Sequence, residues 1–318
     1  MAPEDFLRTH ETSLYGKGEC HVTLADLSYI LLDGLFNSVT LMLASLGMVL
    51  VMGMLRIINF AHGAIFMLGS YVLWLVYDRY PIPIDNLFVR YLLGFGLSVA
   101  VIAVLGVILE RLMRPFNGKM IQSFIVSTGL ILFFQGIVQV SFGIDEKAVP
   151  GLFSGVVAVG GFSVAQSRLW VIVAGTAISV GLFIFLRKTQ TGTAMRAVAQ
   201  QFDLAALQGI NVLAVCILGM AIGCGLAATA GVLMAPIYGI NPYIGSELAT
   251  RCFIVMVLGG IGSFPGAVLA SLLVGFSEAA STNLLGSGVG KLVAYSLILV
   301  VFVMRPMGLY GGREWKHS

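Results

Sequence analysis

Long runs of apolar residues, almost free of charge, follow one another along most of this chain. The first run, about Ile30–Leu55, is long enough to cross the ~30 Å hydrocarbon core of a membrane as a helix. Only 18 Lys and Arg and 15 Asp and Glu occur among 318 residues, and 58% of the residues are hydrophobic. Soluble domains carry about 25% charged residues. The composition therefore excludes a soluble enzyme, a nucleic-acid binder and a disordered linker protein.

Eight apolar blocks can be counted, and they predict an all-α polytopic membrane protein. We expect a polar segment over residues 1–29, a transmembrane domain over residues 30–304 and a tail over residues 305–318. The blocks are about Ile30–Leu55, Phe60–Tyr77, Phe88–Leu112, Gln122–Phe142, Leu169–Leu186, Leu213–Tyr238, Leu248–Ser281 and Lys291–Met304.

Two clusters of glycine and polar residues interrupt this pattern, at residues 53–63 and 259–266. Non-helical backbone at membrane depth is tolerated only where protein or a water-filled cavity covers it, so both are predicted to be broken or re-entrant segments. Their corresponding positions predict inverted repeats around a midplane pathway, although glycines that merely allow tight helix packing would give a similar pattern. The residues concerned are Arg56, Asn59, His62, Gly63, Gly259, Gly260, Gly262, Ser263 and Gly266.

Polar side chains inside the apolar blocks are costly and need an explanation. Arg56, Asn59 and His62 can either bond the backbone groups that the first interruption frees or line a pathway. Four other ionisable residues lie near block ends, where long side chains can reach the membrane interface: Asp33, Glu247, Glu278 and Lys291.

The charges of the connecting segments predict the orientation in the membrane. Three stretches carry a net charge of +2 each and are expected on the cytoplasmic side; they contain Arg111, Arg187 and Arg305 respectively. The acidic N-terminal segment is expected on the outer side. An outer N-terminus and an inner C-terminus require an odd number of crossings, which fits eight blocks only if the seventh enters and returns at residues 259–266.

The loop over residues 187–211 is predicted to form two short Ala-rich helices. Thr193 and Asp203 are the expected N-caps, and Gly209 is the expected stop of the second helix. Such helices are too short to be stable alone and should dock on a partner. An interfacial helix would instead need more Lys and Arg and larger apolar anchors.

Motifs for chemistry are absent from the sequence. There is no P-loop, no His-Glu-x-x-His and no Gly-x-Ser-x-Gly, and the four cysteines do not have the spacing of a metal site. We therefore predict no enzyme activity, no catalytic residue and no metal site, and expect any ATP hydrolysis on another polypeptide.

Four stretches together resemble one protein family, the LivH-type permease subunits of the hydrophobic amino-acid uptake group of ABC importers. They are residues 53–71, 192–210, 258–268 and 305–311. The resemblance implies a permease subunit that moves branched-chain or related amino acids into the cytoplasm by alternating access, in a bacterial inner membrane. It also implies a second homologous permease subunit, two cytoplasmic ATPases that bind ATP and Mg, a periplasmic substrate-binding protein, and no cofactor in this chain.

The resemblance further implies that residues 192–210 are the segment that couples the permease to the ATPase. The positions that match the family's pattern are Gly192, Arg196, Ala197, Ala199, Asp203, Ala206 and Gly209. Two alternatives stay open: a related permease for urea, amides or aromatic acids, and an ion-coupled secondary carrier. A carrier should hold a buried acid or an ion-ligand cluster at the centre of a span, and the sequence has no acid there.

Overall fold

The computed structural model describes residues 24–79, 86–152, 155–159, 162–305 and 308–310. Most of the predicted N-terminal segment, residues 1–23, and the tail beyond residue 310 lie outside the described residues. Within them the chain is helical apart from one hairpin. The α-helices are α2 (Leu24–Leu55), α3 (Ala61–Trp74), α4 (Leu87–Met113), α5 (Met120–Phe142), α6 (Gln166–Lys188), α7 (Gln190–Gln200), α8 (Phe202–Leu207), α9 (Val212–Met234), α10 (Ile244–Gly259), α11 (Phe264–Leu285) and α12 (Ser287–Met304).

Six of these helices are long and apolar enough to cross a membrane: α2, α4, α5, α6, α9 and α11. This confirms the predicted all-α polytopic class, with fewer full-length spans than the eight apolar blocks. The second block is helical along its length, because α3 of 14 residues continues directly into a π-helical turn at Leu75–Arg79, but it is not among these six helices. The seventh block is divided where the glycines are, because α10 ends at Gly259 and α11 begins at Phe264.

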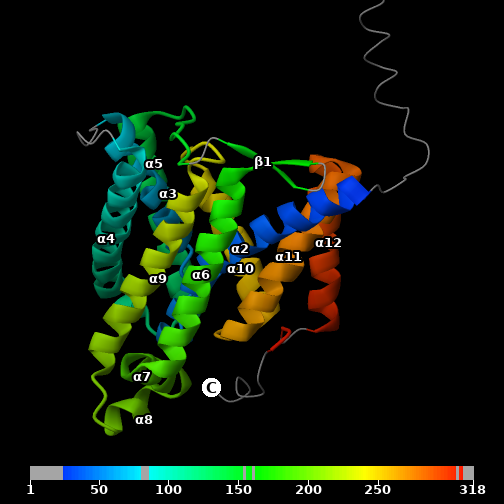
Figure 1. Cartoon of the computed structure of the whole chain (residues 1–318). Coiled ribbons are helices and arrows are strands. Elements are labelled where there is room, and N and C mark those ends of the chain that lie inside the picture. Colours follow the sequence, from blue (N-terminus) through cyan, green and yellow to red (C-terminus); the bar gives the residue numbers. More distant parts are fainter. Residues whose placement is uncertain (1–23, 80–85, 153–154, 160–161, 306–307, 311–318) are drawn as a thin grey trace, which may run out of the picture.

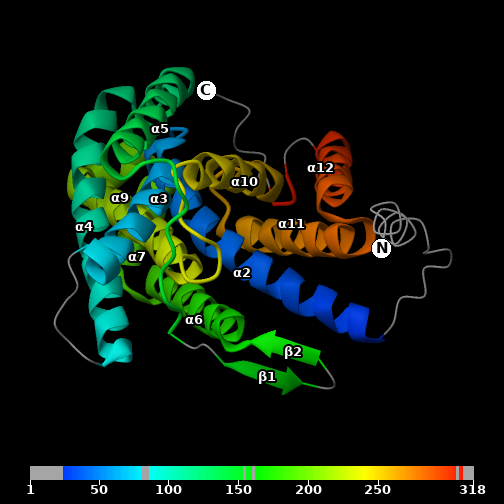
Figure 2. The same cartoon turned by 90° about the horizontal axis from the view of Figure 1, so that it is seen from above.

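Helix α2 is the central element of the bundle. In its most apolar stretch 94% of the residues are buried, and it packs against α6, α7, α9, α10 and α11 (Figures 1 and 2). The Ser38 hydroxyl of α2 donates a hydrogen bond to the Leu272 carbonyl of α11 over 3.4 Å. A helix surrounded by protein in this way is shielded from lipid, which is why it can carry several polar side chains.

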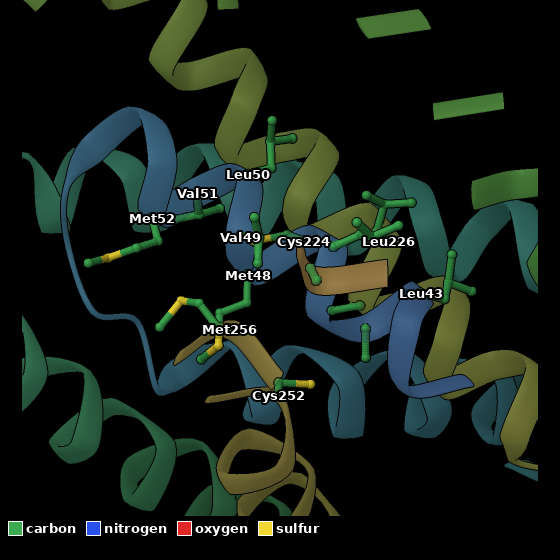
Figure 3. Packing of buried hydrophobic residues seen from close by; sticks show 14 of the residues in the cluster. Leu43, Met48, Val49, Leu50, Val51, Met52, Cys224, Leu226, Cys252 and Met256 are labelled. Carbon is green, nitrogen blue, oxygen red and sulfur yellow. The ribbon is translucent and has the colours of Figure 1, made fainter. Parts of the chain in front are cut away.

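The core lies where α2 meets α9 and α10. Figure 3 shows Met48 and Met52 of α2 in the same cluster as Cys224 of α9 and as Cys252 and Met256 of α10. By contrast, only 22–28% of the corresponding stretches of α4, α5 and α6 are buried. Exposed side chains on these helices are largely Leu, Ile, Val and Phe, as expected for faces that contact lipid.

The two ends of the bundle are different. Helices α7 and α8 lie at one end, together with the last turn of α12, and a β-hairpin lies at the opposite end (Figure 1). The hairpin pairs β1 (Val156–Val159) with β2 (Phe162–Ala165) in antiparallel register, from Val156 opposite Ala165 to Val159 opposite Phe162. Four valines and Phe162 occupy these two strands, and both residue types favour β-structure.

Candidate functional site

The first helix break lies between α2 and α3, at residues 56–60. Its backbone is bonded by two serines of α5: the Ile58 and Phe60 N–H groups donate to Ser123 Oγ and Ser127 Oγ over 3.1 and 3.0 Å. The Ser127 hydroxyl in turn donates to the Ile58 carbonyl over 3.1 Å. Neither serine is among the site residues predicted from the sequence. Their spacing of four residues places them on one face of α5.

The polar side chains of the break bond to other parts of the protein. His62 Nε2 lies 3.1 Å from the Ala44 carbonyl of α2, and Asn59 Nδ2 lies 4.0 Å from the Met220 sulfur of α9. Both residues are buried, and Asn59 Oδ1 and His62 Nδ1 have no hydrogen-bond partner. These two side chains therefore tie the break to α2 and α9, whereas α5 bonds its backbone.

Arg56 connects the first break to α7. Its backbone has a φ of +52°, a left-handed conformation that is uncommon for residues other than glycine. Its guanidinium donates to the carbonyl of Gln200, the last residue of α7, over 3.4 Å. The end of the loop helix and the start of the break are thus in direct contact.

The second break covers residues 260–263, between α10 and α11. Gly260 and Gly262 have φ values of +101° and +77°, which favour glycine. Ser263 then caps α11 by accepting the Gly266 N–H over 3.2 Å. The end of α10 is completed from a distance, because the Leu309 and Tyr310 N–H groups donate to the Leu258 and Gly259 carbonyls over 2.8 and 3.1 Å.

The two breaks meet. A Cβ atom placed on Gly262 would lie 3.4 Å from the Cα of Gly53, in the last turn of α2. At the other side of the first break, α3 crosses α10 so closely that a Cβ on Gly63 would overlap the carbonyl of Gly245. Two segments some 200 positions apart in the sequence, each singled out for its glycines, therefore form one contiguous region.

The loop over residues 187–211 folds into α7 and α8, as predicted, but both expected N-caps are wrong. Thr189, four residues before Thr193, caps α7 by accepting the Gly192 N–H over 2.9 Å, and Gln201 precedes α8. Gly209 does stop α8: its φ is +81°, and the next N–H, that of Ile210, donates back to the Ala205 carbonyl over 3.2 Å, as in a Schellman motif.

The seven residues assigned to coupling divide between the inside and the outside of this loop. Gly192 is buried against Leu186 of α6, and the Arg196 guanidinium donates to the Leu186 carbonyl. Ala197 and Ala199 are partly buried against the core. Arg196 is nevertheless exposed, as are Asp203, Ala206 and Gly209.

Helix α8 also exposes three large apolar side chains that the sequence analysis did not single out. Phe202, Leu204 and Leu207 are 41%, 53% and 82% exposed. We call these three residues the α8 apolar patch. Exposed apolar groups rimmed by polar residues are typical of interaction sites.

A cavity of about 560 Å³ is lined by residues of α2, α6, α10, α11 and α12. It contains all four of the residues that were expected at the membrane interface. The expected position at the membrane interface is wrong for Glu278, which is only 5% exposed. Tyr238, in the loop after α9, also lines the cavity, and partial desolvation raises the pKa of its phenol, which keeps it neutral.

Ion pairs connect the helices around this cavity. Arg251 of α10 lies 2.7 Å from Glu247 and 3.5 Å from Glu278 of α11. Lys291 of α12 lies 3.4 Å from Glu247, and Arg168 of α6 pairs with Asp33 of α2. The partners are up to 135 positions apart in the sequence, so no local pattern could have indicated them.

The six long apolar helices define a polytopic membrane protein by their length and composition. The profile of one protein family, described as branched-chain amino acid transport system, permease component, matches residues 30–304. The chain belongs to this family. It is a permease subunit, the transport component of an ABC system and not its ATPase.

Individual relatives agree with this assignment. The high-affinity branched-chain amino acid transport system permease protein LivH of Escherichia coli strain K12 is 35% identical over 298 residues, which cover 89% of this chain and 96% of the relative. The permease protein BraD of the corresponding Pseudomonas aeruginosa system is 34% identical over 293 residues, 89% of this chain and 95% of the relative. A probable LivH of Methanocaldococcus jannaschii is 24% identical over 313 residues, 90% of this chain and 93% of the relative. No solved structure matches the chain significantly.

Proposed function

We propose that this permease moves branched-chain or related amino acids across the bacterial inner membrane by alternating access, driven by ATPase subunits that dock on α7 and α8. The observation that carries the proposal is the contact chain from α7 to the two breaks. Gln200 at the end of α7 accepts from Arg56, and Arg56 begins the first break. Three residues earlier, in the last turn of α2, Gly53 faces Gly262 of the second break across a gap that one Cβ atom would fill. A displacement of α7 would therefore reach both breaks through packed neighbours.

The α8 apolar patch supports docking on a partner. Leu207 is 82% exposed at the end of the bundle where α7 and α8 lie (Figure 1), and the basic stretches predict that this end is cytoplasmic. Phe202 and Leu204 lie beside it on the same short helix. A groove on an ATPase would shield these three side chains from water and fix the position of α7.

We assign the remaining segments of the chain and the partner subunits within the same transport system. The transmembrane domain covers residues 30–304, with the coupling loop at residues 187–211 and the tail at 305–318 on the cytoplasmic side. Residues 1–29 face the periplasm, where a substrate-binding protein delivers the amino acid. A second homologous permease completes the pathway, two ATPases bind ATP and Mg, and this chain itself needs no cofactor.

Two helix pairs, α2–α3 and α10–α11, are the proposed inverted repeats. Each pair consists of a helix, a break and a returning helix. Glycines flank the first break at Gly53 and Gly63 and lie within the second at Gly260 and Gly262, and Gly53 faces Gly262. In this proposal α10 and α11 enter the membrane and return, which accounts for an outer N-terminus and an inner C-terminus. The breaks are the points where the pathway opens to one side at a time.

The test is uptake of radiolabelled L-leucine into vesicles that contain the chain with its co-purified subunits. We expect uptake that requires ATP, and a loss of about tenfold or more in Leu207→Asp, because a charge in an apolar contact costs more than ~1.4 kcal/mol. Ile144→Asp is the matched control: Ile144 is 66% exposed in the loop after α5, and uptake should stay normal. Gradient-driven uptake by the isolated chain would contradict the proposal, and so would full activity of Leu207→Asp.

A further inference from the structure

The cavity between α2, α6, α10, α11 and α12 has the size and the lining of a ligand site. Its volume of about 560 Å³ is within the ~300–1,000 Å³ typical of small-molecule pockets. Apolar side chains such as Phe66, Ile244 and Leu248 form part of the wall, and charged groups of both signs form another part. An occupant should therefore combine an apolar body with charges of both signs.

The charged groups are shared rather than paired one to one. Arg251 forms ion pairs with both Glu247 and Glu278, over 2.7 and 3.5 Å, and Glu247 forms ion pairs with both Arg251 and Lys291. The Nε of Arg251 is buried and has no hydrogen-bond partner. A buried donor without an acceptor is costly, so a carboxylate that reached this guanidinium would gain a hydrogen bond that no protein group supplies.

The cavity also has one acid more than it has bases. Four carboxylates line it against three cations: Asp33, Glu146, Glu247 and Glu278 against Arg168, Arg251 and Lys291. The surplus favours a ligand that brings an ammonium group. A zwitterion can supply the ammonium group and the carboxylate together without changing the net charge, which avoids the large cost of placing an unpaired charge among buried groups.

We propose that this cavity is a low-affinity transit site for a zwitterionic aliphatic amino acid. The ligand carboxylate is bound by Arg251 and Lys291, its ammonium group by Glu278 and Glu247, and its side chain by the apolar wall near Phe66. Binding exchanges each protein ion pair for a pair with the ligand. This inference rests on the proposed function, and it adds that this chain recognises the amino acid directly.

The site can be tested by saturation-transfer NMR on the detergent-purified complex, without ATP and without a binding protein. The probes are L-leucine and two analogues with the same side chain, isoamylamine without the carboxylate and 4-methylpentanoate without the ammonium group. We expect saturation transfer to the L-leucine methyl groups and a signal about tenfold lower for both analogues, because the unmatched charges of the site penalise each of them. Equal signals for the three compounds would overturn the proposal.

Variants connect the signal to the named residues. Lys291→Gln and Glu278→Gln should each lower the L-leucine signal by about fivefold or more, since each removes a partner of one ligand charge. Lys291 is half exposed, so its variant should fold even if Glu278→Gln does not. Asp145→Asn, an exposed acid of the outer loop that does not line the cavity, is the matched control. An unchanged signal in Lys291→Gln would contradict the proposal, whereas ATP-driven uptake tests the proposed function separately.

Discussion

Gly53 of α2 and Gly262 of the α10–α11 turn lie against each other, so that a Cβ on Gly262 would be 3.4 Å from the Cα of Gly53. Gly53 lies in the last turn of a helix that is buried in protein, and Gly262 has a φ of +77° in the turn after α10. Since a Cβ atom on either residue would be in van der Waals contact with the other, the two glycines leave a gap of about one methyl group between the last turn of α2 and the second break.

Replacement of Gly262 by Ala should impair transport more than stability. The left-handed backbone costs an alanine about 1–2 kcal/mol, and Gly118→Ala is the matched control, since Gly118 has a φ of +74° and open space around it. Thermal unfolding should show similar losses for the two variants. Uptake should fall about 2- to 30-fold in Gly262→Ala alone, the range for altered coupling between sites. Equal uptake by the two variants would contradict a role for this contact.

Ser127→Ala should destabilise the first break. The Ser127 hydroxyl accepts from the Phe60 N–H and donates to the Ile58 carbonyl. Both backbone groups are partly buried, and the loss of their partner should cost about 1 kcal/mol. Thr128→Ala removes an exposed hydroxyl that bonds only within α5 and should change the unfolding temperature little. Thermal unfolding of the two variants checks this prediction. A larger drop in unfolding temperature in Thr128→Ala than in Ser127→Ala would contradict the role of Ser127.

Arg56→Gly should separate stability from coupling. Glycine adopts a φ of +52° without strain, so the variant should be as stable as the parent or more stable, by up to about 1 kcal/mol. It loses the guanidinium that bonds Gln200 of α7, so ATPase activity should continue while uptake per ATP falls. Arg56→Lys, which keeps the charge, should retain more of the coupling. Wild-type uptake per ATP in Arg56→Gly would refute the transmission of motion through this residue.

Arg114→Met should be destabilising because it leaves a buried carboxylate without its partner. Glu110 is 1% exposed on its side chain and lies 2.6 Å from Arg114, which is 41% exposed. We expect a measurable drop in unfolding temperature, smaller than for a fully buried pair because water screens Arg114. Arg111→Met, in the same turn, is the control. Adding Glu110→Gln to Arg114→Met should restore much of the stability, and additive losses in the double variant would argue against the pairing.

Most of the helical architecture could be predicted from local sequence. Runs of about 20 apolar residues define the long helices, and the glycines near Gly53 and Gly262 mark where helices stop. Gly209 was also predictable, because a stop after an Ala-rich helix needs a left-handed residue. These features depend on residues that are close together in the chain.

The contacts that complete the candidate site could not be predicted in this way. Ser123 and Ser127 bond the first break across 65 to 69 positions, and many serines in the chain have the same local surroundings. Thr189 rather than Thr193 caps α7, because α6 continues to Lys188 and leaves only one residue between the two helices. Glu278 is buried within an ion-pair cluster because α10 and α11 pack together, which its neighbours in sequence do not indicate.

The burial of α2 has a consequence for how the protein is made. Among the described helices α2 is synthesised first, yet the hydrogen-bond acceptor for its Ser38 is on α11, 234 positions later. At roughly 5–20 residues per second this interval lasts about 10–50 s. During that time the polar groups of α2 face lipid or the insertion machinery instead of α11. The central helix of the folded protein is thus made early, and it can pack against α11 only near the end of synthesis.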